Sequence, residues 1–80
     1  MMDTMNKTLI NKMLNVMRAK ADTTWKAMYG THQYKHIIMV LNKRDDEITY
    51  VDKEMVGINL RTLCLALGIQ YYALLQEACS

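Results

Sequence analysis

The sequence predicts a small α+β domain with a long N-terminal helix, an antiparallel β-hairpin and a C-terminal pair of short helices. Three observations predict this order. Apolar residues recur at helical spacing in residues 1–30, an apolar run with strand-forming residues lies in 32–58, and a glycine separates two short apolar segments in 59–80. A chain of 80 residues forms at most one domain, so these are three parts of a single unit.

The stretch from Asp3 to Tyr29 has the pattern of one amphipathic helix. Asp3 or Thr4 can cap its start, and Gly30 can supply a left-handed stop. The Thr23–Thr24 pair marks the point where we expect this helix to bend or restart. Its apolar positions follow spacings of three and four residues, and they are Met5, Leu9, Met13, Met17, Ala21, Trp25 and Met28.

The middle of the chain is predicted to form the antiparallel hairpin. Gln33 to Asn42 contains a continuous apolar run, which favours a strand that is covered on both faces. The polar stretch 42–47 supplies the turn. Ile48 to Val51 forms the second strand, because Thr, Tyr and Val favour a pleated surface. Lys53 to Ile58 forms either a short third strand or a loop.

The C-terminal segment has the pattern of a helix-turn-helix. Asn59 is a plausible N-cap for a short helix from Leu60 to Leu67, and a second helix runs from Ile69 to about Ala78. Such a unit needs a glycine at the turn and a small residue four positions earlier, where the helices approach most closely. Gly68 and Cys64 fill these positions.

Apolar residues must also lock the two helices together, and Leu67, Ile69 and Leu74 can do so. Glu77 departs from the pattern, because an aliphatic side chain is usual at that position. Leu75 or Ala78 can take over its packing. A helical hairpin without any nucleic-acid role has the same pattern, so both interpretations stay open.

Five residues on this unit are candidates for contact with DNA or with a protein partner: Arg61, Gln70, Tyr71, Tyr72 and Gln76. Gln can read adenine, and Tyr can reach phosphates. The predicted recognition helix has no Lys or Arg, although most nonspecific affinity for DNA comes from these residues. The charge would have to come from Arg61 or from residues 1–35, which hold six Lys/Arg against two Asp.

The segments Ile48–Val51 and Leu63–Ile69 together resemble the amino-terminal domains of phage antirepressors. In those domains a strand of this kind runs into a helix that ends in Leu-Gly and an aliphatic or aromatic residue. The resemblance covers less than half of the chain, and the long N-terminal helix has no counterpart in it. It implies a phage or prophage regulatory protein that acts on DNA or on a repressor in the host cytoplasm.

Two hypotheses of different class follow. The first is a small DNA-binding regulator that works as a dimer through the C-terminal helix. The second is a phage-encoded inhibitor or adaptor that binds a host protein and makes no nucleic-acid contact. The second is motivated by the absence of basic residues in 70–76 and by Met and Tyr residues, which interfaces favour.

Composition limits the remaining alternatives. A thin, Met-rich core predicts a homodimer or an obligate partner. Two cysteines, with no signal-like start and no long apolar run, predict a cytoplasmic protein with free thiols and no membrane contact. His32 and His36 are expected to be structural, and Asp45–Glu47 is expected to be a solvated turn. We therefore expect no enzyme, no metal and no cofactor.

Overall fold

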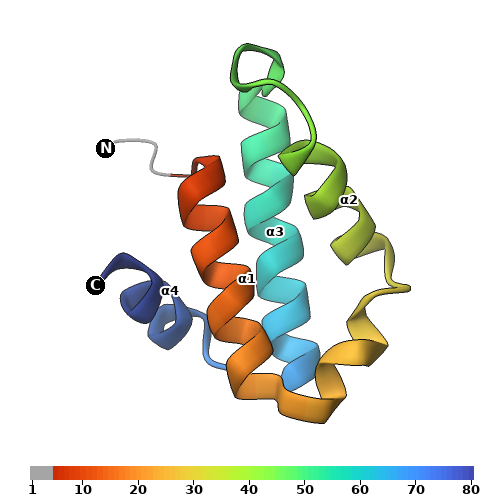
Figure 1. Cartoon of the computed structure of the whole chain (residues 1–80), viewed down its shortest axis with the longest axis vertical. Helices are drawn as coiled ribbons and strands as arrows, with labels where there is room; N and C mark the ends of the chain where they lie inside the picture. The colour runs from red at the N-terminus through yellow and green to blue at the C-terminus, as the bar shows by residue number, and fades with distance from the viewer. Residues whose placement is uncertain (1–4) are drawn as a thin grey trace.

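The computed structural model describes residues 5–80, and it shows an all-α fold. Within this range there are four α-helices and two short 3-10 segments, and there is no strand. The helices are α1 (Lys7–Ala21), α2 (His32–Leu41), α3 (Tyr50–Leu67) and α4 (Tyr71–Cys79) (Figure 1). The 3-10 segments are Asp22–Met28 and Asp45–Glu47. The predicted α+β class is therefore wrong, and the error lies in residues 32–58.

The long helix α3 lies at the centre of the molecule, between α1 and α2 (Figure 1). α2 packs along α3, and α4 packs against α1. The principal axes measure 34, 28 and 16 Å, so the molecule is flat. One apolar core joins all four helices. Its fully buried side chains are Ile10, Met13, Met17, Ile37, Val40, Val56, Leu60, Leu63, Cys64 and Leu74.

The N-terminal segment is interrupted where one continuous helix was predicted. Asn6 caps the start of α1, because its side chain accepts a hydrogen bond from the backbone N–H of Leu9 at 2.9 Å. The predicted caps, Asp3 and Thr4, lie outside the described residues. α1 ends because Asp22 has a positive φ of 54°, and a 3-10 segment follows. Gly30 does not supply the left-handed stop, because it does not have a positive φ. Among the glycines of residues 5–80, Gly68 has one.

The apolar stripe predicted for this segment is confirmed as core despite the break. Met5 is half-buried, and the other six positions of the stripe are buried. A 3-10 segment has three residues per turn, so residues three apart share a face. Trp25 and Met28 therefore continue the stripe beyond Ala21. The interruption predicted near the two threonines occurs at the residue just before them.

The apolar run that predicted the first strand forms α2. Thr31 caps the helix, since its hydroxyl accepts a hydrogen bond from the backbone N–H of Tyr34 at 3.2 Å. Ile37 and Val40 are buried, and Met39 between them is exposed. This three-residue period belongs to a helix, because alternate residues would share a face in a strand. Burial against α3 thus overrides the preference of β-branched residues for strands.

The predicted second strand, Ile48–Val51, forms the loop and first residues that lead into α3. Thr49 and Asp52 make a capping box, in which each side chain accepts a hydrogen bond from the other's backbone N–H at 3.0 Å. α3 then continues through 53–58, where a third strand or a loop was predicted. It also continues through Asn59, which was predicted as an N-cap and lies in the helix interior.

Among the described helices none is by itself both long and apolar enough to cross a membrane. α3 and α4 reach that length and composition only when taken together, and the chain bends by 116° between them.

Candidate interaction surface

The predicted turn at Gly68 is present between α3 and α4. Gly68 has φ 73° and ψ 25°, a left-handed conformation that suits glycine. The N–H of Ile69 donates to the carbonyl of Cys64 at 2.8 Å, and the N–H of Gly68 donates to Leu65 at 3.3 Å, which is a Schellman motif. The bend of 116° lies within the range of roughly 90–120° that helix-turn-helix units show.

The residues predicted to lock these helices together lie in the apolar core or pack against it. Cys64 and Leu74 are buried, and Leu67 and Ile69 are half-buried. Ala78 is buried in place of the usual aliphatic residue, whereas Glu77 is exposed and pairs with Lys20 of α1 at 2.6 Å. The first helix of the pair differs from the prediction, because it begins at Tyr50 and not after Asn59.

Three of the five predicted contact residues lie together. The guanidinium carbon of Arg61 lies 4.9 Å from the centroid of the Tyr71 ring, which is a cation–π contact. Burial raises the pKa of the Tyr71 hydroxyl, and the positive charge of Arg61 acts in the opposite direction. The ring of Tyr72 lies edge-on to that of Tyr71, with centroids 6.1 Å apart. Gln70 and Gln76 are exposed, before and within α4.

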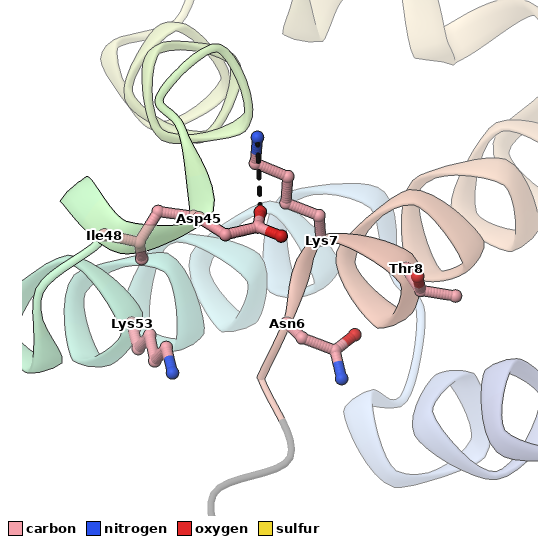
Figure 2. A pocket seen from close by; sticks show the side chains of 6 residues that line it. All are labelled: Asn6, Lys7, Thr8, Asp45, Ile48 and Lys53. Atoms are coloured by element: carbon pink, nitrogen blue, oxygen red, sulfur yellow. Dashed lines mark ion pairs between the residues drawn. The ribbon is translucent and has the colours of Figure 1, made fainter.

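The basic residues of the N-terminal segment lie at several separate places, and two of them, Lys12 and Lys20, lie beside α4. Lys20 is paired with Glu77, and the guanidinium of Arg18 lies over Trp25 at 5.3 Å from the ring centroid. Figure 2 shows the Lys7 ammonium directed at the carboxylate of Asp45, 3.5 Å away, in a pocket of about 260 Å³ beside the start of α1. Lys12 lines a separate pocket with Ala78 and Cys79. The cationic surface that DNA binding needs is therefore divided.

The outer face of α3 is apolar and exposed, which the sequence reasoning missed. Its large side chains expose 63%, 40%, 50% and 84% of their surface, and they are Val51, Met55, Ile58 and Leu65. Together with Thr62 they are spaced four, three, four and three residues apart. Residues at this spacing form one stripe along a helix. The stripe lies opposite the buried residues Val56, Leu60 and Leu63, since successive residues are about 100° apart.

The outer face, defined as these five residues, carries no charge. The hydroxyl of Thr62 donates a hydrogen bond to the carbonyl of Ile58 at 3.1 Å, so this hydroxyl has a hydrogen-bond acceptor within its own helix. Monomeric proteins expose single apolar residues commonly, but a continuous apolar stripe marks an interaction site. The outer face is therefore the strongest candidate for contact with another protein.

A groove runs along one edge of the outer face. It has a volume of about 420 Å³, and its lining includes Glu54, Gly57, Ile58, Arg61 and Tyr71. A Cβ added to Gly57 would meet no atom within 4 Å, so this glycine leaves open space above the helix. Two of the predicted contact residues, Arg61 and Tyr71, thus line a groove beside the apolar stripe.

The missed signal was readable in the sequence. The stripe from Val51 to Leu65 has the spacing of a coiled-coil seam. The predicted strand, the predicted loop and the predicted N-cap at Asn59 interrupt this period, which becomes continuous because residues 50–67 form one helix.

The histidines have different surroundings. Nδ1 of His36 lies 2.8 Å from Nδ2 of Asn59, and His32 is exposed one turn earlier on α2. In residues 5–80 no three His, Cys, Asp or Glu side chains are grouped so that they could hold a metal ion.

Comparison with known proteins found no matching family model, no matching curated protein and no matching solved structure.

Proposed function

We propose that this chain is a protein-binding module and that the outer face of α3 is its contact surface. The exposed, uncharged stripe from Val51 to Leu65 carries the proposal. Removing apolar surface from water is favourable by about 25 cal/mol for each Å². A partner that covers the stripe would therefore gain affinity from side chains that have no role in the core of this chain.

The geometry of the stripe indicates the chemistry of the partner. Positions spaced four and three residues apart pack against another helix that carries an apolar stripe of its own. Glu54 and Arg61 are seven residues apart on one edge of the face, so they can orient the bound helix by charge. We propose a binding role without catalysis, in a reducing cytoplasm, and the free thiols of Cys64 and Cys79 support that location.

Site-specific photo-cross-linking tests the binding role. A photoreactive amino acid replaces Ile58 in the full chain, expressed in its native cells, and the control carries it at Ala19, an exposed position of α1. We expect a discrete protein adduct from position 58 and none from position 19. If position 58 gives no adduct above the control, the outer face binds no protein and the proposal is wrong.

DNA binding is a second candidate, and the helix-turn-helix geometry favours it. The bend of 116° and the left-handed Gly68 support this candidate, because helix-turn-helix units have a similar bend and a glycine at the turn. A gel shift with random duplex at low salt tests it, because nonspecific affinity usually lies at about 10⁻⁴ to 10⁻⁶ M. A shift that Arg61→Ala or Tyr72→Ala weakens, and that Ile58→Glu leaves unchanged, would favour DNA over protein.

A further inference from the structure

We propose that the partner of the outer face is a second copy of this chain, packed antiparallel on α3 about a two-fold axis beside Ile58. This inference rests on the proposed function, because it names the occupant of the same face. Three features of the surface carry it: the symmetry of the stripe, the charges along one edge and the position of α2 along the other.

The two ends and the middle of the stripe have the symmetry that an antiparallel pair requires. Ile58 is its middle position, with Val51 seven residues before it and Leu65 seven residues after it. An axis at Ile58 therefore brings Val51 against Leu65 of the second copy and brings the two Ile58 side chains together. Met55 precedes the axis by three residues and Thr62 follows it by four, so Met55 lies about one residue, or about 1.5 Å along the helix, from the level of Thr62 of the second copy. Every contact along this seam is uncharged, and the same surface serves both copies, as a two-fold interface requires.

Charges on one edge of the face select the antiparallel direction. Glu54 precedes the axis by four residues and Arg61 follows it by three, so the axis places each Glu54 against Arg61 of the second copy. The result is two equivalent ion pairs. The cation–π contact with Tyr71 holds the Arg61 guanidinium on this edge, and its N–H groups can still donate to a carboxylate.

The position of α2 argues against the parallel alternative. In a parallel pair, the Glu54–Arg61 edge of one copy would meet the opposite edge of the other copy. That opposite edge is occupied by α2, as the His36–Asn59 and Lys43–Asp52 contacts show. The charges would then face α2 and would find no complementary pair.

In the antiparallel pair the two α2 edges lie on the same side of the seam. The His36–Asn59 and Lys43–Asp52 contacts fix the register of α2 against α3. This register places Met39 level with Val56, close to the two-fold axis. Met39 exposes 51% of its surface, so the two Met39 side chains can extend the apolar contact beyond the α3 seam.

The length of the seam sets its strength. The rise from Val51 to Leu65 is about 21 Å at 1.5 Å per residue, or about two heptads. Such a seam covers less area than permanent dimers bury, and its interface belongs with small, reversible ones. We therefore expect a dimer that forms and dissociates with concentration.

Analytical ultracentrifugation of the full chain from low micromolar to millimolar concentration tests this proposal. We expect the wild type to pass from monomer to dimer across that range. Ile58→Glu places two like charges at the axis and should leave a monomer at every concentration. Ala19→Glu adds the same charge to an exposed site on α1 and should dimerise like the wild type. Circular dichroism checks that each variant remains helical.

A charge-reversal series tests the direction of packing. Glu54→Arg alone sets Arg against Arg61 of the second copy, and we expect the dissociation constant to rise roughly tenfold. Arg61→Glu alone should weaken the dimer at least as much, because it also removes the contact with Tyr71. The double variant Glu54→Arg/Arg61→Glu restores two opposite-charge pairs and should recover affinity relative to both single variants. Recovery distinguishes antiparallel packing from the parallel alternative.

Each contrary result has a definite meaning. A wild-type monomer at every concentration would overturn the self-association, and so would a dimer that Ile58→Glu leaves intact. A double variant no tighter than the single variants would overturn the antiparallel arrangement. The mass of the adduct at position 58 separates this inference from the binding role. An adduct with twice the mass of the chain supports both proposals, and an adduct of another mass supports only the binding role. The absence of any adduct contradicts the binding role.

Discussion

Nδ2 of Asn59 lies 2.8 Å from Nδ1 of His36, and this hydrogen bond joins the interior of α3 to the middle of α2. Within residues 5–80, Asn59 is the polar residue that is buried among the apolar residues of the core. A buried amide without a partner is unfavourable, so the contact specifies which turn of α3 lies against which turn of α2. The Lys43–Asp52 pair, at 2.8 Å, fixes the same register nearer the connecting loop.

Asn59→Ala should lower the free energy of unfolding by about 1–3 kcal/mol, because it leaves the imidazole of His36 without its partner. Urea denaturation followed by the fluorescence of Trp25, the single tryptophan, measures the change. His36→Ala and the double variant complete a double-mutant cycle. The sum of the losses in unfolding free energy for the two single variants should exceed the loss for the double variant. If the losses are strictly additive, the contact contributes nothing to stability.

Gly68→Ala should lower the free energy of unfolding by about 1–2 kcal/mol, since a residue with a Cβ is strained in the left-handed conformation. The φ of 73° at Gly68 is the basis of this expectation, and nothing near the added Cβ would clash. Thermal or urea unfolding gives the change. An unchanged stability would mean that the turn relaxes without strain.

Gly57→Ala is the matched substitution with the opposite sign. Gly57 lies inside α3, and an added Cβ meets no atom within 4 Å. Alanine should therefore stabilise the helix by roughly 0.5–1 kcal/mol, through its better helix propensity. The same unfolding measurement applies, and a destabilised variant would show that the groove beside Ile58 is closed in solution.

The stability of the protein should fall on acidification between about pH 4 and about pH 2 through Asp52. The hydrogen bond from Lys43, and then that from the backbone of Thr49, lowers the pKa of Asp52 from 3.8 to about 2. A carboxylate with a lowered pKa in the folded state stabilises the fold above its ordinary pKa, and this contribution is lost as the pH falls through the lowered value.

Unfolding of the wild type and Asp52→Asn at a series of pH values measures this contribution. The difference in stability between them should shrink as the pH falls from about 4 to about 2. Asp45→Asn is the control, because Asp45 is 90% exposed and its pairing with Lys7 at 3.5 Å is looser. A difference between wild type and Asp52→Asn that does not change with pH would contradict the assignment.

The two cysteines should differ in reactivity. Burial raises the pKa of the Cys64 thiol to about 11, whereas Cys79 is exposed at the end of α4. Because the thiolate is the reactive form, iodoacetamide at pH 8 should label the native chain once, at Cys79. Mass spectrometry counts the adducts, and Cys79→Ser should remain unlabelled until the protein is unfolded. Rapid labelling of Cys64 in the native variant would show that α3 and α4 separate readily.

The local features of the chain were predictable from its sequence. The core stripe from Leu9 to Met28 follows from apolar spacing, and the turn at Gly68 follows from a glycine between two apolar segments. The Thr49–Asp52 capping box is also a local pattern, although it was interpreted as part of a strand. These features depend on residues a few positions apart, whose side chains meet whenever the local helix forms.

The state of residues 37–41 and the outer face of α3 were decided by tertiary contact. The apolar run is compatible with a buried strand or a buried helix, and the difference in intrinsic preference is below about 1 kcal/mol per residue. Packing on α3 selected the helix, because residues at a spacing of three, Ile37 and Val40, could then be buried together. Once α2 lay on one side of α3, residues 51–65 were left with a second apolar stripe facing outward. By itself the sequence determined where apolar residues recur, and the tertiary structure determined which of them are covered, because burial depends on the neighbours that each face acquires.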